Sequence, residues 1–388
     1  MIRFGIDILL KQQPSWKLTN IGLVTNNAAT TFNGVLSRKA LLDAGFNIKR
    51  LFSPEHGLDV NGADGDAIKD TFDTVTGLPV TSLYGENLAP SQSDLMNIDI
   101  LLFDIPDVGS RFYTYLWTMT YVMEAAAQYS KILIILDRPN PISGNLQLTE
   151  GPMLDMTTTS FLGRWPLPIR HSCTLGELAI YFNTTRNIKV SLEIVPCPGW
   201  NRNMFQPDWL LPFVPTSPAM QSFESMLLYP GICLLEATNV SEGRGTFLPF
   251  CILGAPWIDG TALATAFNRL GHTGVKATNT SYVPREGKYK HETCHGIKLE
   301  ISAPQEIRSV INGLLIIQLI RTMYPDHFSW RPYPTNVNPS GAFHLDRLLG
   351  ISNSESLFDL PFLVFIDKIK QMTQIHDWKQ QISNYLIY

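Results

Sequence analysis

A glutamate and a histidine, Glu55 and His56, stand where an enzyme could place an acid–base pair. They follow a short apolar run, residues 48–52, which has the composition of a buried strand. Pro54 ends this run because proline has no N–H to donate to a sheet. Ligands bind at the carboxyl ends of strands in open α/β sheets. We therefore expect the rest of the chain to build a cleft around Glu55.

Three further polar clusters lie at the ends of predicted strands or in adjoining loops. They contain Asp104, Asp107 and Arg111, then Asp137, Arg138 and Asn140, and finally Arg170 with His171. Carboxylates alternate with arginines here, so four clusters at one sheet edge predict an enclosed polar site. The alternative is that each Asp–Arg pair only caps a helix or bridges two loops, as many isolated ion pairs do.

A glycine-rich segment, residues 239–246, carries the same kind of polar residues later in the chain. It contains Glu242 and Arg244, and the glycines on both sides of Arg244 allow the backbone to approach a ligand closely. We predict that these two side chains close the cleft from the other side. A turn with one ion pair is the plainer interpretation.

The elements that must position these residues alternate between strand and helix. Apolar runs typical of strands cover residues 21–25, 48–52, 80–84, 99–103, 131–136 and 189–195. Helical patterns cover residues 35–44, 112–126 and 174–184. This alternation predicts an α/β fold with a Rossmann-like, mostly parallel, doubly wound sheet.

The pattern changes near residue 228, and 388 residues are too many for one ordinary core. We predict a catalytic domain over residues 1–228 and a smaller α+β domain over residues 229–388 that closes the cleft. The G-x-G-x-x-G turn is missing after the first strand, where residues 25–29 stand instead, and there is no Walker A loop. The sequence therefore predicts no cofactor.

His291, Glu292 and His295 formally match the H-E-x-x-H motif of zinc proteases. That motif needs both histidines on one helical face. Gly296 follows at once, however, and apolar residues then alternate with polar ones, which indicates a strand. We predict no metal site here.

The composition, 45% hydrophobic and 16% charged residues, is typical of a well-packed globular protein. A net charge of −4 gives no general attraction for phosphate backbones, so nucleic acid is not an expected partner. The first residues contain no signal peptide, and no apolar run could span a membrane. We expect a cytoplasmic protein, or a periplasmic or secreted one if a leader has been removed.

Several motifs together resemble one known family. They are Ser-Pro-Glu-His-Gly (53–57), Asp-x-x-Asp-Val-Gly-x-Arg-Phe-Tyr-Thr-Tyr (104–115), Asp-Arg-Pro-Asn-Pro (137–141), Glu-Gly-Pro (150–152) and Thr-Asn-Val-Ser-Glu-Gly-Arg-Gly-Thr (238–246). In this order they resemble the exo-β-N-acetylmuramidase (NamZ-like) family, formerly a domain of unknown function. The resemblance implies a glycoside hydrolase with a cleft between two domains. It also implies that N-acetylmuramic acid is released from the non-reducing ends of peptidoglycan fragments.

The resemblance places Glu55 on the family's catalytic glutamate, and we predict that it is the general acid. Glu242, Asp104 or Asp107, or the 2-acetamido oxygen of the substrate, could meet the oxocarbenium-like centre. The substrate-binding candidates are His56, Asp107, Arg111, Tyr113, Arg138, Asn140, His171, Asn239 and Arg244. The lactyl carboxylate of muramic acid calls for an arginine fork, which Arg111, Arg138 or Arg244 could supply.

Two other functions compete with this hypothesis. The protein could bind peptidoglycan fragments without cleaving them. It could also be a metal-dependent amidase built on His291, Glu292 and His295.

Overall fold

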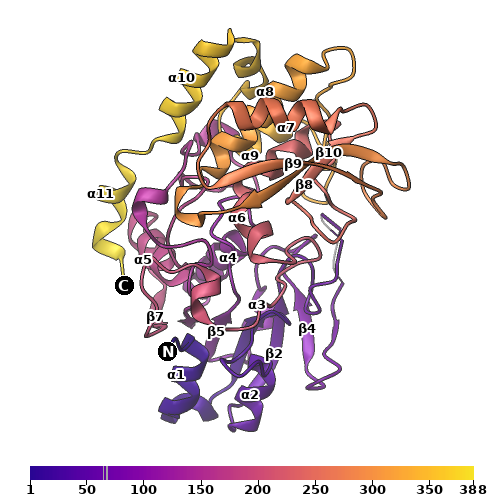
Figure 1. Ribbon diagram of the computed structural model, residues 1–388. Helices are drawn as coiled ribbons and strands as arrows, with labels where there is room; N and C mark the ends of the chain where they lie inside the picture. Colours follow the sequence, from indigo (N-terminus) through magenta and orange to yellow (C-terminus); the bar gives the residue numbers. More distant parts are fainter. Residues whose placement is uncertain (64, 67–68) are drawn as a thin grey trace.

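The structure, a computed structural model, describes residues 1–63, 65–66 and 69–388, and among these a seven-stranded sheet forms the lower half of the molecule (Figure 1). The strand order is β3-β4-β2-β1-β5-β6-β7. The strands are β1 (Ile21–Thr25), β2 (Ile48–Ser53), β3 (Thr71–Phe72), β4 (Pro79–Ser82), β5 (Ile100–Asp104), β6 (Ile132–Leu136) and β7 (Ser191–Val195). The edge strand β3 is antiparallel to β4, and the other neighbours pair in parallel. The predicted fold class is confirmed.

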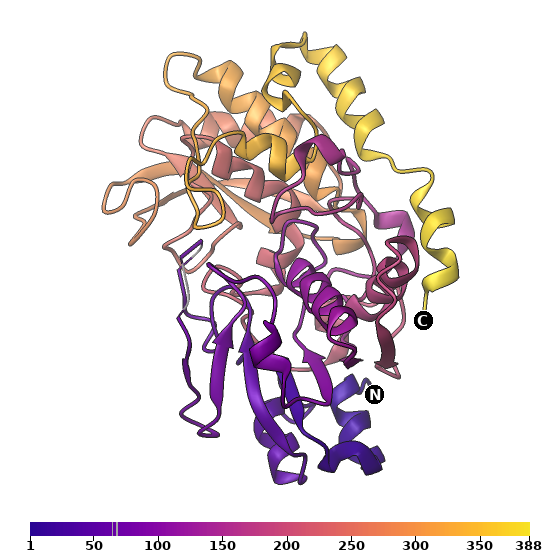
Figure 2. The ribbon, with the colours of Figure 1, turned by 180° about the vertical axis from the view of Figure 1, so that it is seen from behind.

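Helices cover both faces of this sheet, as a doubly wound fold requires. Helices α1 (Gly5–Gln12) and α2 (Ser37–Asp43) lie on one face, and α4 (Tyr115–Gln128) and α5 (Leu175–Thr185) lie on the other, which is turned to the viewer in Figure 2. The short helix α3 (Gln92–Leu95) precedes β5. Leu101 and Phe103 of β5 pack with α4 and α5, whereas Leu102 packs with α1 and α2. Such strands are apolar throughout because both faces are buried.

The second part of the chain contains the antiparallel sheet β8-β10-β9. Its elements are α6 (Phe223–Ile232), β8 (Ile252–Ala255), α7 (Gly260–Arg269), β9 (Val275–Tyr282), β10 (Cys294–Ile301), α8 (Ser309–Met323) and α9 (His344–Leu349). Helices α7 and α8 pack on each other, and α7 also packs on β9 and β10. The predicted boundary after residue 228 falls inside α6, a helix that packs against α8.

The C-terminal segment returns to the first part of the chain. Helices α10 (Phe362–Thr373) and α11 (Trp378–Ile382) run along one side of the molecule, and the chain ends beside α5 and β7 (Figures 1 and 2). The indole N–H of Trp378 donates to the carbonyl of His171 at 2.9 Å, and the hydroxyl of Tyr388 donates to Asp137 at 2.8 Å. These contacts attach the last residues to the sheet-containing domain.

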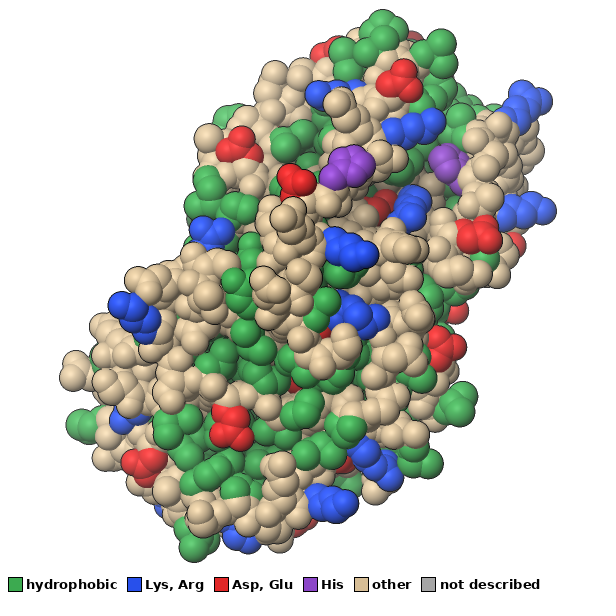
Figure 3. Space-filling model, turned by 90° about the vertical axis from the view of Figure 1, so that its left-hand side faces the viewer, with side chains coloured by type: hydrophobic (Ala, Val, Ile, Leu, Met, Phe, Trp, Pro, Cys, Tyr) green, Lys and Arg blue, Asp and Glu red, His purple; other side chains and the backbone are tan. Residues whose placement is uncertain are grey.

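The face of the molecule shown in Figure 3 is neither uniformly charged nor uniformly hydrophobic. Basic and acidic side chains are interspersed there, and hydrophobic side chains gather over the lower half, where the large sheet lies. In the part of the chain that the structure describes, no helix has the length and apolar character needed to cross a bilayer.

Candidate active site

A pocket lies between the two parts of the chain, and we call it the Glu55 pocket. Both parts supply residues that line it. From the sheet-containing part come Glu55, His56, Tyr84, Tyr113 and Thr114, and from the second part come Glu236, Arg244, Tyr333 and His344. Four of the residues predicted from the sequence therefore meet in one place: Glu55, His56, Tyr113 and Arg244.

Glu55 is buried at the amino end of helix α4. Pro54 follows the last residue of β2, so the chain leaves the sheet and turns before Glu55. The side chain is 6% exposed. Its Oε2 accepts a hydrogen bond from the Thr114 hydroxyl at 2.5 Å, and its Oε1 accepts one from the Gly65 N–H at 3.2 Å.

His56 lies next to Glu55 with a left-handed backbone, at φ 66°. Its Nδ1 is 2.8 Å from the carbonyl oxygen of Gly62, so Nδ1 carries the hydrogen of that bond. In the neutral ring this leaves Nε2 as an acceptor. The position of the imidazole is thus fixed by the backbone of its own loop.

Tyr113 and Tyr115 form an aromatic pair whose ring centroids lie 4.8 Å apart. Both hydroxyls bind Thr216: that of Tyr113 donates to the side-chain oxygen at 2.8 Å, and that of Tyr115 to the carbonyl at 2.7 Å. Burial raises the pKa of both phenols, so both stay protonated donors.

The sequence analysis missed two titratable residues of the Glu55 pocket, Glu236 and His344. Glu236 is 4% exposed, and its Oε1 and Oε2 lie 2.6 Å from Nη2 of Arg244 and 3.0 Å from Nε2 of His344. Burial alone would raise the pKa of Glu236, but Arg244 and His344 outweigh it and lower this pKa to about 2. A lone acid in the apolar run 233–237 was the signal that could have revealed Glu236. His344 has no comparable local signal.

Glu242 lies behind Arg244, outside the lining of the Glu55 pocket. Its Oε2 accepts a hydrogen bond from Lys288 at 3.0 Å, and its Oε1 is 3.5 Å from Nε of Arg244. Lys288 also donates to the carbonyls of Leu235 and Val240. Glu242 therefore belongs to a network that holds Arg244 in place.

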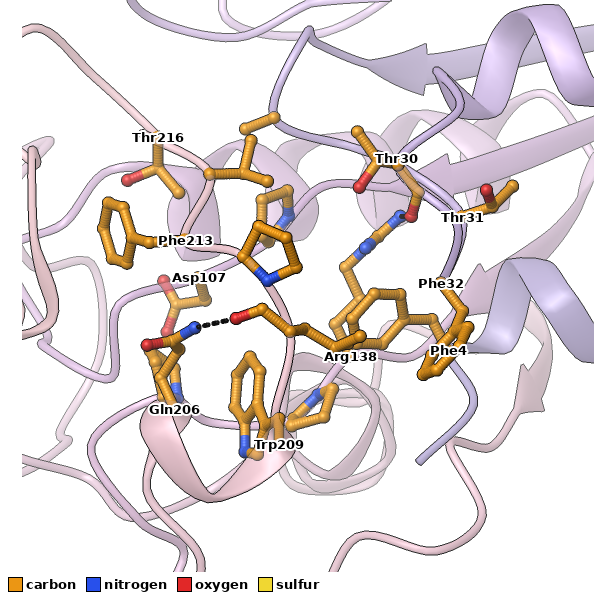
Figure 4. A pocket seen from close by; sticks show the side chains of 18 of the residues that line it. Phe4, Thr30, Thr31, Phe32, Asp107, Arg138, Gln206, Trp209, Phe213 and Thr216 are labelled. Atoms are coloured by element: carbon orange, nitrogen blue, oxygen red, sulfur yellow. Dashed lines mark hydrogen bonds between the residues drawn. The ribbon is translucent and has the colours of Figure 1, made fainter. Parts of the chain in front are cut away.

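Asp104 is a second carboxylate that the structure does not bring to Glu55. It is fully buried, and both of its oxygens accept hydrogen bonds from Arg138, at 2.6 and 3.0 Å. Arg138 lines a separate pocket together with Asp107 (Figure 4). Since Arg138 lines this other pocket, it does not form an arginine fork beside Glu55.

Arg111 is fully buried, and its guanidinium joins three segments of the chain through hydrogen bonds. It donates to the carbonyls of Pro152, Leu167 and Leu348, the last of which belongs to α9. A Cβ at Gly350 would lie 2.7 Å from Nη2 of Arg111, which explains a glycine there. Burial lowers the pKa of Arg111 to about 9. The structure places Arg111 within the protein rather than in the lining of the Glu55 pocket.

Asn140, His171 and Asn239 also bind backbone groups. The amide of Asn140 donates to the carbonyl of Cys173, and that of Asn239 to the carbonyl of His327. His171 Nδ1 accepts from the Cys173 N–H, so in the neutral ring the hydrogen is on Nε2, which lies 3.4 Å from Asp107. None of the three is among the described residues that line the Glu55 pocket.

The segment with His291, Glu292 and His295 is a turn followed by β10, so the predicted strand is present. His295 lies on that strand and binds the Ser281 hydroxyl at 2.8 Å. The two histidines thus do not share a helical face, as the zinc-protease motif requires. Across the described residues no cluster of three His, Cys, Asp or Glu side chains has the spacing of a metal site.

Comparisons with known proteins point to the same family over nearly the whole chain. The family description "Exo-beta-N-acetylmuramidase NamZ, N-terminal" matches residues 21–224, and its C-terminal counterpart matches residues 227–388. The peptidoglycan beta-N-acetylmuramidase NamZ of Bacillus subtilis is 41% identical over 331 residues, which cover 85% of this chain and 80% of that protein.

Two crystal structures of DUF1343 family proteins from Bacteroides fragilis have the same fold. They are 28% and 29% identical to this chain, with TM-scores of 0.87 and 0.73, and each alignment covers 100% of this chain and 99% of the other. The family resemblance drawn from the sequence motifs is therefore confirmed. The chain belongs to the NamZ family of exo-β-N-acetylmuramidases.

Proposed function

We propose that the protein is an exo-β-N-acetylmuramidase, a glycoside hydrolase that releases N-acetylmuramic acid from the non-reducing ends of peptidoglycan fragments. The observation that carries this proposal is the buried Glu55 carboxyl, which lines a pocket together with the cationic Arg244. The name of the Bacillus subtilis relative supports the same reaction.

Glu55 is the general acid of the proposed reaction. Its protonated carboxyl donates a proton to the glycosidic oxygen as the bond to the leaving sugar breaks. Thr114 is a positioning residue, because its hydroxyl binds Oε2 of Glu55 at 2.5 Å. Thr114 is the N-cap residue of α4, so this hydrogen bond ties the Glu55 carboxyl to the amino end of that helix.

Arg244 binds the lactyl carboxylate of muramic acid. Of the three candidate arginines, it is the one that lines the Glu55 pocket. Glu236 and Glu242 lie 2.6 and 3.5 Å from its nitrogens, so the guanidinium is oriented before substrate arrives. A preoriented arginine loses less side-chain entropy when it binds a carboxylate.

The 2-acetamido oxygen of the substrate is the group that meets the developing positive charge. Among the described residues that line the Glu55 pocket, the carboxylates are Glu55 and Glu236. Glu236 is bound through both oxygens to Arg244 and His344, which leaves it poorly suited to attack carbon. Substrate-assisted hydrolysis needs only one enzyme carboxyl to transfer the proton.

The direct test uses the purified protein, a chromogenic aryl β-N-acetylmuraminide and a muramyl-glucosaminyl disaccharide. Glu55→Gln should lower kcat on the disaccharide by about 10²- to 10⁴-fold. The loss on the aryl substrate should be smaller, because an aryl oxide leaves with less help from an acid. Glu300→Gln, an exposed glutamate on β10, is the matched control and should retain wild-type activity.

The alternatives give different results in the same assays. A non-catalytic binding protein would bind the disaccharide equally well as wild type and as Glu55→Gln, and neither form would turn it over. A metal-dependent amidase would cleave neither substrate, because neither contains a peptide, and its activity on a muramyl peptide would be lost with a chelator.

A further inference from the structure

The Glu55 pocket continues into a second pocket, which Phe247 and Arg285 line and which we call the Phe247 groove. The two share four lining residues: His56, Ala219, Arg244 and Tyr333. Other residues of the Glu55 pocket, such as Met220 and Leu348, are only 1% exposed, whereas Phe247 is 81% exposed. The Phe247 groove therefore leads from the Glu55 pocket toward solvent.

The position of Glu55 decides which part of a substrate lies in each pocket. His56 lines both pockets and follows Glu55 directly in the chain, so the proton donor of the proposed reaction lies beside their junction. The glycosidic oxygen must lie within hydrogen-bond reach of this donor when the bond breaks. An enzyme that removes one terminal sugar needs an enclosed site for that sugar and an open path for the remainder. With muramic acid in the Glu55 pocket, the leaving sugar therefore lies in the Phe247 groove.

The side chains of the Phe247 groove suit a sugar ring. The exposed ring of Phe247 offers an aromatic surface on which the apolar face of a sugar can pack. The guanidinium carbon of Arg285 lies 5.2 Å from the centroid of this ring, and among the described residues the guanidinium has no ion-pair partner. Its N–H groups can therefore donate to a ligand. Glu286 lines the same wall with the opposite charge, so this wall favours a neutral polar ligand over an ion.

Backbone contacts hold the two loops that carry Phe247 and Arg285. The Arg285 N–H donates to the carbonyl of Gly245 at 2.9 Å. A Cβ at Gly245, whose φ is 76°, would lie 2.6 Å from the backbone nitrogen of Glu286, so the loops pack too closely for a side chain there. Next to Phe247, the hydroxyl of Thr246 donates to the carbonyl of Gly243 at 2.6 Å. A surface that is already ordered loses less entropy when it binds a ligand.

From this arrangement we infer that the Phe247 groove binds the N-acetylglucosamine ring that follows muramic acid in the substrate. The inference rests on the proposed function for the order of the two rings. Phe247 packs against the apolar face of the N-acetylglucosamine ring, and Arg285 donates a hydrogen bond to a hydroxyl or to the acetamido carbonyl. The groove thus makes the enzyme prefer a sugar over a small alcohol as leaving group.

The binding test compares two ligands on the full-length Glu55→Gln protein, the muramyl-glucosaminyl disaccharide and N-acetylmuramic acid alone. Titration calorimetry should show that the disaccharide binds about tenfold tighter or more. Adding Phe247→Ala should weaken the disaccharide about tenfold more than the monosaccharide, whereas Phe247→Tyr keeps an aromatic face and should retain most of the difference. Phe72→Ala is the matched control, since Phe72 is 71% exposed on β3 and lies outside the described lining of both pockets. Thermal unfolding should show that each variant is folded.

Three results of this titration would overturn the inference. The first is that the disaccharide binds no tighter than N-acetylmuramic acid, or shows no saturable binding at all. The second is that Phe247→Ala weakens both ligands equally, which would give Phe247 only a structural role. The third is that N-acetylmuramyl dipeptide, which carries a peptide on the lactyl group and no second sugar, gains the Phe247-dependent affinity in place of the disaccharide. The groove would then bind peptide.

The kinetic test separates this inference from the proposed function. Phe247→Ala should lower kcat/KM about tenfold more for the disaccharide than for methyl β-N-acetylmuraminide, whose leaving group is also an alcohol but has no ring to pack on Phe247. Equal losses on both substrates would contradict the inference and leave the proposed function intact. If the wild-type protein cleaves neither substrate, the proposed function fails instead. The titration then still decides whether the Phe247 groove binds the second sugar.

Discussion

The carboxylate of Glu236 lies 3.0 Å from the imidazole of His344, although 108 positions separate the two residues in the chain. The same carboxylate lies 2.6 Å from the Arg244 guanidinium. The three side chains form one network in the lining of the Glu55 pocket, in which Glu236 and His344 are buried and Arg244 is half-buried. Because its members come from separate segments, the network depends on the packing of the second domain and of α9.

Glu236→Gln should make stability less dependent on acid pH. The pKa of Glu236 is lowered from 4.5 to about 2 in the folded protein, so the unfolded chain binds more protons between these values. Stability from this carboxylate is therefore complete above pH 4.5 and is lost as the pH falls toward 2. The shift corresponds to about 3 kcal/mol. Urea unfolding of both proteins across this pH range measures it.

The control for Glu236 is Glu300→Gln, which removes an exposed carboxylate that pairs only with Lys298 among the described residues. It should keep the wild-type pH dependence. If Glu236→Gln shows the same slope as the wild type, the network does not hold the low pKa in solution.

Thr114→Val should lower kcat about tenfold and leave KM almost unchanged. The substitution keeps the shape of the side chain but removes the hydroxyl that binds Glu55 at 2.5 Å. Within the described residues the Thr114 side chain makes no capping bond to α4, so helix stability should hardly change. Thr114→Ser restores the hydroxyl and should recover most of the rate. Equal rates for the Val and Ser variants would show that the hydrogen bond does not position Glu55.

Arg244→Ala should raise KM for muramyl substrates at least about tenfold more than for the corresponding glucosaminyl substrates, which lack the lactyl carboxylate. Steady-state kinetics on an aryl pair of the two sugars measures the difference. Thermal unfolding must accompany it, because Arg244 also neutralises Glu236. Equal increases in KM for both sugars would remove Arg244 from the recognition of the carboxylate.

Arg111→Met should lower the free energy of unfolding by about 3 kcal/mol or more, since it leaves the buried carbonyls of Pro152, Leu167 and Leu348 without their donor. Arg269→Met, at an exposed arginine of α7, is the matched control and should change stability little. If Arg111→Met unfolds like the wild type but loses affinity for muramyl substrates, Arg111 binds substrate, as the sequence analysis predicted.

The sequence by itself determined the elements of the sheet and the position of the acid. Strand β1 was predicted at its observed bounds, β5 differs from its prediction by one residue at each end, and β6 differs by one residue at its amino end. Buried parallel strands are recognisable because both faces must be apolar. Pro54 ends strand β2 because proline has no N–H to donate to the sheet. Glu55 could therefore be assigned to the carboxyl edge of the sheet from the sequence alone.

Only the tertiary structure decided which charged residues share the pocket with Glu55. The sequence offered three arginines of equal standing. The fold buries Arg111 against backbone carbonyls, pairs Arg138 with Asp104, and brings Arg244 to the pocket. Local sequence patterns reveal the spacing of apolar residues and the ends of strands. The partner of a charged side chain, however, depends on which distant segment packs beside it. For the same reason the sequence alone did not identify Glu236 and His344 as residues of the Glu55 pocket.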